Sequence, residues 1–270
     1  GARVIVGARR PEQARETLAS LSGDVVVLPL DLLLPGSIET FATGVAAQTD
    51  RLDLLINNAA VMACPLTRDE RGYEFQIATN HLGHFELTAR LWPLLTRSTH
   101  PRVVVLSSIG HRLNGLDVDD LNFLHRDYDK WLAYGQAKSA NALFALELDR
   151  LGEPLGVRSF AVHPGGIRTP LQRHLSMDEQ VAMGWYDEDG KLNEAFKSVE
   201  EGAATTVWCA TSPTLGGMGG VYCEDCNIAL PSDRAPNPYC GVEPHVRNEE
   251  LAAALWSRSE ELCRLQFRPG

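Results

Sequence analysis

The sequence lacks three features that mark particular classes of protein: a long hydrophobic run, a dense cysteine framework and an excess of basic residues. No apolar run approaches the ~20 residues of a membrane-spanning helix, so we expect no membrane span. Six cysteines are scattered over 270 residues, a usage typical of reduced thiols and of a cytoplasmic protein. The net charge of −10 argues against nucleic acid as a partner, because phosphate binding needs clustered Lys and Arg.

No internal repeat, low-complexity tract or linker divides the chain, whose length suffices for one large α/β domain. Short apolar segments alternate with segments of helical periodicity, which predicts a Rossmann-like, doubly wound parallel sheet in a single domain over residues 1-270. The predicted strands are residues 3–8, 25–28, 52–56, 102–106, 157–162 and 220–223. The predicted helices are residues 11–21, 38–45, 69–97, 134–148, 200–210 and 248–265. Residues 109–130 and 228–244 are predicted loops.

Tyr134 and Lys138 open one of these helices and lie about one turn apart on the same face. A free phenol has a pKa near ~10, and a neighbouring ammonium lowers that pKa because it stabilises the phenolate. The pair can therefore work as a general acid/base unit. The same spacing is also common on ordinary helix surfaces, so its meaning depends on the residues around it.

Ligands bind at the carboxyl ends of the strands in a parallel sheet, and functional side chains follow several predicted strands. Arg9 follows the first strand and either binds a phosphate on a ribose 2′ oxygen or is a solvated turn residue. Asp31 follows the second strand and either accepts from an adenine amine or marks the turn. Asn58 and Ala59 follow the third strand, within a run of small residues that lets a cofactor approach the backbone closely.

The fourth and fifth predicted strands also end in groups that can bind a ligand. Ser108 follows the fourth strand, and its hydroxyl can hydrogen-bond a substrate oxygen. The fifth strand runs into Pro164-Gly165-Gly166-Ile167-Arg168-Thr169. The amides of this turn and the Thr169 hydroxyl can hold a carboxamide or a phosphate.

Taken together, these motifs resemble the short-chain dehydrogenase/reductase family over most of the chain. Asn57-Asn58-Ala59-Ala60 is similar to the family's Asn-Asn-Ala-Gly motif, with Ala in place of the final Gly. His163-Pro164-Gly165 is similar to its Pro-Gly motif. Four residues match its catalytic set in the expected order: Asn80, Ser108, Tyr134 and Lys138. The segment from Asn80 to Phe85 and the Ala8-Arg9 strand end look like the branch of the retinol dehydrogenases and the WW-domain oxidoreductase.

The resemblance implies an NADP-preferring oxidoreductase, with NAD possible, that interconverts a carbonyl and an alcohol on a small or lipophilic substrate. Tyr134 would exchange the proton with the substrate oxygen, and Ser108 would hydrogen-bond that oxygen. Lys138 would lower the pKa of Tyr134 and bind the nicotinamide ribose, while Asn80 would hold a water that links Lys138 to solvent. The cofactor contacts expected are Arg9, Asp31, Asn58, Ala59, Tyr134, Lys138, Pro164, Gly165 and Thr169. A homo-oligomer is a further possibility.

The chain departs from the family at its first element. The family's opening strand and its Thr-Gly-x-x-x-Gly-x-Gly loop, which cradles the cofactor pyrophosphate, are absent. The sequence starts at Gly1 and enters a strand pattern at once, so we expect a fragment of a longer protein. In the family fold the missing strand lies between the strand from Arg3 and the strand from Leu52, which predicts a gap in the sheet.

Two other classes of function stay open at this point. A non-catalytic protein that binds a nucleotide weakly, or serves as an interaction surface, is suggested by the missing pyrophosphate loop. An epimerase or dehydratase can use the same Tyr134 and Lys138 pair. The Asn-Asn-Ala motif argues against that second alternative. So does the short region after the fifth strand, which leaves little room for a separate substrate domain.

Cysteine spacing raises one further possibility. Cys223 and Cys226 form a C-x2-C pair that Cys240 and His245 would complete as a zinc set. Two buried thiols on and after the last strand are the simpler interpretation, so we predict no metal.

An apolar segment near residues 170–190 carries five side chains suited to a flexible flap over a pocket at the strand ends: Leu171, Leu175, Met177, Met183 and Trp185. Ordinary packing of a surface helix explains them equally well. Two histidines near the expected site, His84 and His111, are predicted to be packing or surface residues.

Overall fold

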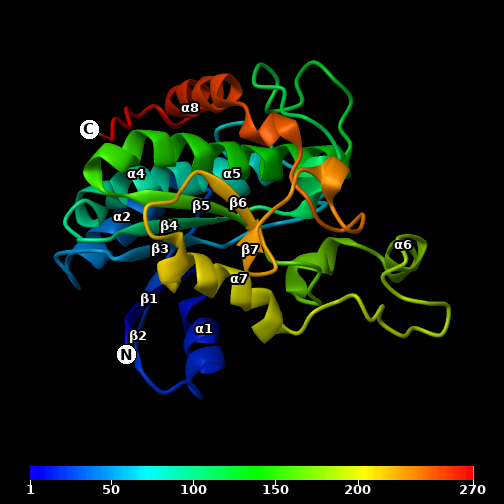
Figure 1. The fold of residues 1–270 in the computed structure, drawn as a ribbon, viewed down its shortest axis with the longest axis horizontal. Coiled ribbons are helices and arrows are strands. Elements are labelled where there is room, and N and C mark those ends of the chain that lie inside the picture. Colours follow the sequence, from blue (N-terminus) through cyan, green and yellow to red (C-terminus); the bar gives the residue numbers. More distant parts are fainter. Residues whose placement is uncertain (270) are drawn as a thin grey trace.

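Strands and helices alternate along the chain, and helices cover both faces of a parallel sheet in the computed structural model, which describes residues 1–269 (Figure 1). The strands are β1 (Arg3–Ala8), β2 (Asp24–Pro29), β3 (Leu54–Asn57), β4 (Arg102–Leu106), β5 (Arg158–His163), β6 (Val221–Glu224) and β7 (Asn227–Ile228). The helices are α1 (Pro11–Leu18), α2 (Pro35–Ala46), α3 (Phe75–Ile77), α4 (Gly83–Leu95), α5 (Lys130–Gly152), α6 (Met177–Ala182), α7 (Val199–Thr211) and α8 (Glu249–Cys263). The predicted Rossmann-like α/β class is confirmed.

The sheet is divided into two parts. β1 and β2 pair in parallel with each other, whereas β3, β4, β5 and β6 form a second parallel group to which β7 adds an antiparallel edge. Within residues 1–269 no strand joins β1 to β3, so the predicted gap lies at the expected place. The apolar side chains of Val4 and Ile56, on β1 and β3, are 46% and 44% exposed as a result. Figure 1 shows β1, β2 and α1 grouped at the lower edge of the larger part.

Alternating side chains of β4 enter two different cores, as the two-residue period of a strand requires. Val103 and Val105 pack with residues of α2, α4 and α5 on one face. Val104 and Leu106 pack with Phe160, Cys209 and other residues of β5 and α7 on the opposite face. The strand is therefore buried on both faces, which explains its continuous apolar sequence.

Helix α5 lies across the middle of the larger part of the sheet and is itself covered by α8 (Figure 1). It begins four residues before Tyr134, because Asp129 caps it by accepting from the amides of Trp131 and Leu132. Leu143 and Leu148 of α5 are fully buried. A helix enclosed by sheet and helix has no solvent face of its own over most of its length, so its two catalytic candidates are carried on a rigid, buried element.

One predicted helix, over residues 69–97, begins in the wrong place. Residues 69–74 form a turn in which Asp69 accepts from the amides of Arg71 and Tyr73, and the helical segment begins with α3. A π-helical stretch over Ala78–Leu82 then joins α3 to α4. The polar residues of the turn compete for backbone hydrogen bonds, which is why periodicity alone placed the start too early.

The remaining boundaries agree closely with prediction, with two refinements. The predicted terminal helix over residues 248–265 is α8, capped by Asn248. The segment near 170–190 contains a 3₁₀ turn over Pro170–His174 and the short helix α6. Its side chains divide into two groups, because Leu175 is buried whereas Met177 and Met183 are 52% and 42% exposed. The two methionines are therefore not part of an apolar lining.

The divided sheet predicts unequal protection of backbone amides. We expect amides of β1 to exchange with solvent at least ~10-fold faster than those of β4, because β1 has one neighbouring strand and β4 has two. Hydrogen exchange followed by mass spectrometry measures this, with β5 as the internal reference for a strand buried on both sides. Equal protection in β1 and β4 would contradict the division.

Candidate active site

The end of β4 holds α5 in register through the backbone carbonyl of Leu106. That oxygen accepts from Nζ of Lys138 at 2.8 Å and from Nδ2 of Asn141 at 2.9 Å. In return, Ser107 donates its hydroxyl to the carbonyl of Lys138 at 2.8 Å. These three hydrogen bonds place one turn of α5 directly over the carboxyl end of β4.

Ser108 follows immediately and meets Tyr134. Its Oγ accepts from the amide of Gly110 at 3.1 Å and caps a 3₁₀ turn over Ile109–Arg112. A Cβ on Gly110 would lie 2.8 Å from Cε1 of Tyr134, so glycine is needed for the turn to lie against the phenol ring. The nearby Ser108 hydroxyl lowers the pKa of Tyr134. The structure thus brings Ser108, Tyr134 and Lys138 together.

Burial dominates the electrostatics of this group. Tyr134 is 5% and Lys138 3% exposed. Burial raises the pKa of Tyr134 to about 12, against the smaller opposite effect of Ser108. Burial also lowers the pKa of Lys138 to about 7. The pKa of Tyr134 is therefore raised and not lowered as expected, since desolvation of the phenolate is the dominant effect.

Asn80 is fully buried in the π-helical stretch and holds the segment after β3. Its Oδ1 accepts from the amide of Val61 at 2.8 Å, and its Nδ2 donates to the carbonyl of Val61 at 2.9 Å. Its own carbonyl accepts from Nδ1 of His84 at 2.9 Å. Burial lowers the pKa of His84 to about 4, and Lys138 adds a smaller effect in the same direction.

The other strand-end residues are spread over both parts of the sheet. Arg9, after β1, is exposed, and it lines a hollow of about 380 Å³ with residues of α1. Asp31, after β2, accepts from the amide of Leu33 at 3.0 Å, which is the turn-marking alternative. Asn58 and Ala59 are exposed after β3. Within residues 1–269, Arg9 and Asp31 form no hydrogen bond or ion pair with the Tyr134 group.

The turn after β5 lies beside the same strand ends. Gly165 has φ +93°, a left-handed conformation that favours glycine, and follows the half-buried Pro164. The Thr169 hydroxyl accepts from the amide of Leu171 at 3.2 Å and caps the next turn. One of the hydrogen bonds that the Thr169 hydroxyl can form is thus made within the chain.

An apolar wall surrounds the Tyr134 ring. Met62, Ala63 and Leu175 are buried against it, and three partly buried side chains complete the cluster: Trp131, Leu171 and Trp185. Three of the five predicted flap residues therefore pack beside the candidate acid/base group.

Comparison with known proteins identifies the family of this chain. The family described as short chain dehydrogenase matches residues 1–180. The chain belongs to the short-chain dehydrogenase/reductase family. The dehydrogenase/reductase prx1 of Penicillium roqueforti is 36% identical to it over 271 residues, covering 98% of this chain and 78% of that protein. Human retinol dehydrogenase 12 is 35% identical over 273 residues, covering 99% of this chain and 80% of its own.

Solved structures give the same result for the fold. The crystal structure of an uncharacterized protein from Mycobacterium paratuberculosis is 31% identical, with a TM-score of 0.74, and the match covers 99% of this chain and 86% of that one. This short-chain dehydrogenase/reductase is accordingly an oxidoreductase that acts on small molecules. The resemblance to the branch of the retinol dehydrogenases is confirmed, and the two alternative classes of function are not favoured.

The sequence also supports predictions about membrane spans and metal sites. Within residues 1–269, none of the helices combines the length and hydrophobicity required to cross a bilayer. In the same part of the chain, His, Cys, Asp and Glu side chains nowhere gather in a group of three suited to a metal ion. Cys223 is buried, whereas Cys226 is exposed in the turn after β6, so the prediction of two buried thiols is wrong for Cys226.

Two buried histidines contact the Ser108 turn. His111 is expected from the sequence to lie near the site as a packing or surface residue, and His163 has no predicted role of its own. His163 Nδ1 accepts from the amide of Ile109 at 3.2 Å, and His111 Nδ1 lies 2.7 Å from the carbonyl of Ser108. Spacing gives a signal for His111, three residues after Ser108 on a single turn. His163 is one residue before the Pro-Gly motif, and only the parallel pairing of β4 with β5 brings it near.

Burial of Lys138 predicts a pH-dependent stability that one substitution removes. Its folded pKa of about 7 lies below the unfolded value near ~10.4, so the unfolded chain binds more protons between these values and stability rises with pH there. We expect Lys138→Met to lose this contribution, up to about 1.4 kcal/mol per pH unit. Urea unfolding of both proteins between pH 7 and 8.5 measures it. If the stability of both proteins changed equally with pH, the lowered pKa of the buried Lys138 would be contradicted.

Proposed function

We propose that this protein is an NADP-preferring oxidoreductase that interconverts a carbonyl and an alcohol on a small lipophilic substrate, with Tyr134 as the acid/base group. The observation that carries the proposal is the setting of the buried Tyr134 ring. It packs against the turn that Ser108 caps and against an apolar wall, and Nζ of Lys138 lies 5.8 Å from its centroid. Its neighbours are the carboxyl ends of β4 and β5, where ligands bind in sheets of this kind.

Tyr134 is suited to donate a proton when a carbonyl is reduced. Its raised pKa, about 12, keeps the phenol protonated at neutral pH. The Ser108 hydroxyl can donate a second hydrogen bond to the same substrate oxygen and stabilise its developing charge. In the oxidising direction the phenol must first lose its proton, which requires that Lys138 carry its charge nearby.

The residues around Lys138 fit a nicotinamide nucleotide, which supplies or accepts the hydride when bound. An ammonium has three donors, and within the described residues that of Lys138 forms one hydrogen bond, to the carbonyl of Leu106. Two donors stay available for ribose hydroxyls. The pyrophosphate end is different, because residues 1–269 contain no glycine-rich turn between a strand and a helix start beside this group.

Arg9 supports a preference for NADP over NAD. The residue is exposed at the carboxyl end of β1 and forms no hydrogen bond within residues 1–269. A free guanidinium there suits the 2′-phosphate of NADP, whereas a carboxylate would suit the free hydroxyl of NAD.

The apolar wall supports a lipophilic substrate. Leu175 and the indoles of Trp131 and Trp185 lie beside the Tyr134 ring. A carbonyl attached to an alkyl or aryl group would place its apolar part against these side chains, and its oxygen between Ser108 and Tyr134. The segment near residues 170–190 would then act as the flap of this substrate pocket.

Replacing Tyr134 by Phe tests the acid/base role. We expect Tyr134→Phe to lower kcat at least ~10³-fold, because general acid catalysis is lost, while cofactor affinity changes less than ~3-fold. Turnover of a panel of carbonyls with NADPH, together with a fluorescence titration of the cofactor, measures both quantities. Tyr73→Phe is the matched control, since its hydroxyl donates to the carbonyl of Leu262, away from the site. Substantial activity in Tyr134→Phe would refute the assigned role.

Replacing Arg9 tests the cofactor preference. We expect Arg9→Gln to lower kcat/KM for NADPH about 10- to 100-fold, the effect of one lost charged hydrogen bond, with little change for NADH. The ratio of the two kcat/KM values reports the preference without interference from protein stability. An equal loss with both cofactors would show that Arg9 does not read the 2′-phosphate.

A further inference from the structure

The peptide group between Ser108 and Ile109 is held at both of its polar ends by buried imidazoles. The carbonyl of Ser108 accepts from the backbone amide of His111 at 3.1 Å and also lies 2.7 Å from Nδ1 of the same residue. The amide of Ile109 donates to Nδ1 of His163 at 3.2 Å. His111 is fully buried and His163 is 6% exposed. The two histidines come from different elements, the 3₁₀ turn after β4 and the end of β5.

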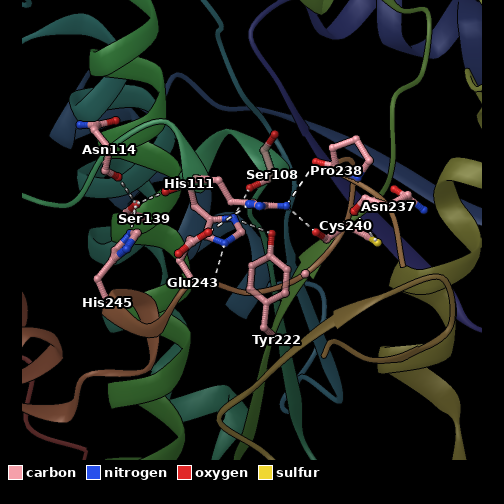
Figure 2. A network of polar contacts seen from close by, with 12 residues as sticks. Ser108, His111, Asn114, Ser139, Tyr222, Asn237, Pro238, Cys240, Glu243 and His245 are labelled. Carbon is pink, nitrogen blue, oxygen red and sulfur yellow. Dashed lines mark hydrogen bonds and ion pairs between the residues drawn. The ribbon is translucent and has the colours of Figure 1, made fainter. Parts of the chain in front are cut away.

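The partners of His111 settle its tautomer. Its Nε2 faces the amide of Glu243 at 3.1 Å, which can only donate, so Nε2 is the acceptor and the proton is on Nδ1. Nδ1–H then donates to the carbonyl of Ser108, which can only accept. The phenol of Tyr222 lies 3.2 Å from the same nitrogen, and its ring packs against the imidazole at a centroid distance of 4.9 Å. Figure 2 shows His111 enclosed by Ser108, Tyr222 and Glu243.

A second set of contacts ties the Ser108 turn to a distant segment, residues 237–245. Arg112 donates to Oε1 of Glu243 at 3.1 Å and to the carbonyl of Cys240 at 2.7 Å. His245 Nε2 lies 3.0 Å from the hydroxyl of Ser139, on the same turn of α5 as Lys138. Figure 2 shows Ser139 of α5 together with Cys240, Glu243 and His245 of the segment in one network. The Ser108 turn is thus fixed between α5 and a part of the chain more than 100 residues away.

We propose that His111 is a positioning residue for Ser108. Nδ1–H of His111 donates to the carbonyl of Ser108, the backbone amide of Glu243 fixes the tautomer of the imidazole by donating to Nε2, and His163 accepts from the amide of Ile109. With both ends of the peptide fixed, the Ser108 backbone keeps its extended conformation (φ −167°, ψ 159°), and its hydroxyl stays directed at the Tyr134 side. The inference rests on the proposed function in one respect, namely that the Ser108 hydroxyl binds a substrate oxygen.

Two isosteric variants separate the two hydrogen bonds of His111. In His111→Asn, the side-chain amide nitrogen takes the place of Nδ1 and keeps the donor to Ser108, while the acceptor for Glu243 is lost. In His111→Gln, the amide oxygen takes the place of Nε2 and keeps that acceptor, while the donor to Ser108 is lost. We expect His111→Gln to lower kcat about 10- to 100-fold and His111→Asn to stay within ~3-fold of wild type, both with unchanged cofactor KM.

A double-substitution cycle with Ser108→Ala tests whether His111 acts through Ser108. If it does, His111→Gln lowers kcat no further in a protein that already carries Ser108→Ala. An undiminished loss in that background would overturn the positioning role. His245→Gln is the control, because its amide can keep the contact with Ser139, and it should leave kcat within ~2-fold of wild type.

Hydrogen exchange tests the same inference without any turnover. In His111→Gln we expect the amide of Ile109 to exchange faster by ~10-fold or more, with the amide of Glu243 unchanged. In His111→Asn we expect the reverse. Absence of this reciprocal pattern would overturn the inference whatever the activity. If wild type turns over no carbonyl or alcohol yet the pattern is found, the proposed function fails and the positioning contact stands.

Discussion

The backbone carbonyl of Leu106 is the point on which the rest of the site depends. It ends β4 and accepts two side-chain donors from one turn of α5, Lys138 and Asn141. Those contacts fix both the rotation of the helix about its axis and its position along the strand. Tyr134 is one turn earlier on α5 and Ser108 two residues further along the chain from Leu106, so their meeting follows from the same register. A slip of one residue would turn Tyr134 away from Ser108.

Burial gives this arrangement its chemistry and also its cost. An ammonium enclosed at 3% exposure with one carbonyl partner destabilises the folded state, which is the physical meaning of its lowered pKa. The packing of α5 offsets that cost, because the helix is enclosed by the sheet and α8. Asn80 has a structural role beside this group. Both polar atoms of its side chain form hydrogen bonds with Val61 and so fix the segment after β3. The backbone carbonyl of Asn80 accepts from Nδ1 of His84 and keeps a second lone pair.

Sequence patterns predicted the fold class, the strand ends and the Ser108, Tyr134 and Lys138 group, because these depend on local periodicity and on residue types at strand ends. They also located the gap beside β3. Two kinds of feature were beyond them. The turn at residues 69–74 depends on the Asp69 side chain competing for backbone amides, which a helical period does not register. The pKa of Tyr134 is raised because the phenol is deeply buried, and burial is a property of the packed structure. The two methionines of the predicted flap face solvent for a similar reason, since apolar composition alone does not distinguish a lining from a surface.

The histidines beside Ser108 show why long-range polar contacts are hardest to predict. His111 and Glu243 are 132 residues apart, and neither belongs to a motif that names the other. Burial lowers the pKa of both His111 and His163 to about 4. For His111, Arg112 and His245 act in the same direction and Glu243 against it; for His163, Lys197 lowers the pKa and Asp225 raises it. Both imidazoles are therefore neutral at neutral pH, and a neutral ring has one donor and one acceptor. The carbonyl of Ser108 accepts from the backbone amide of His111 and gains a second donor from its neutral ring. The amide of Ile109 finds its acceptor on the neutral His163 ring, whereas a protonated His163 would face it with a second donor. Burial of the two rings thus favours a single orientation of this peptide group.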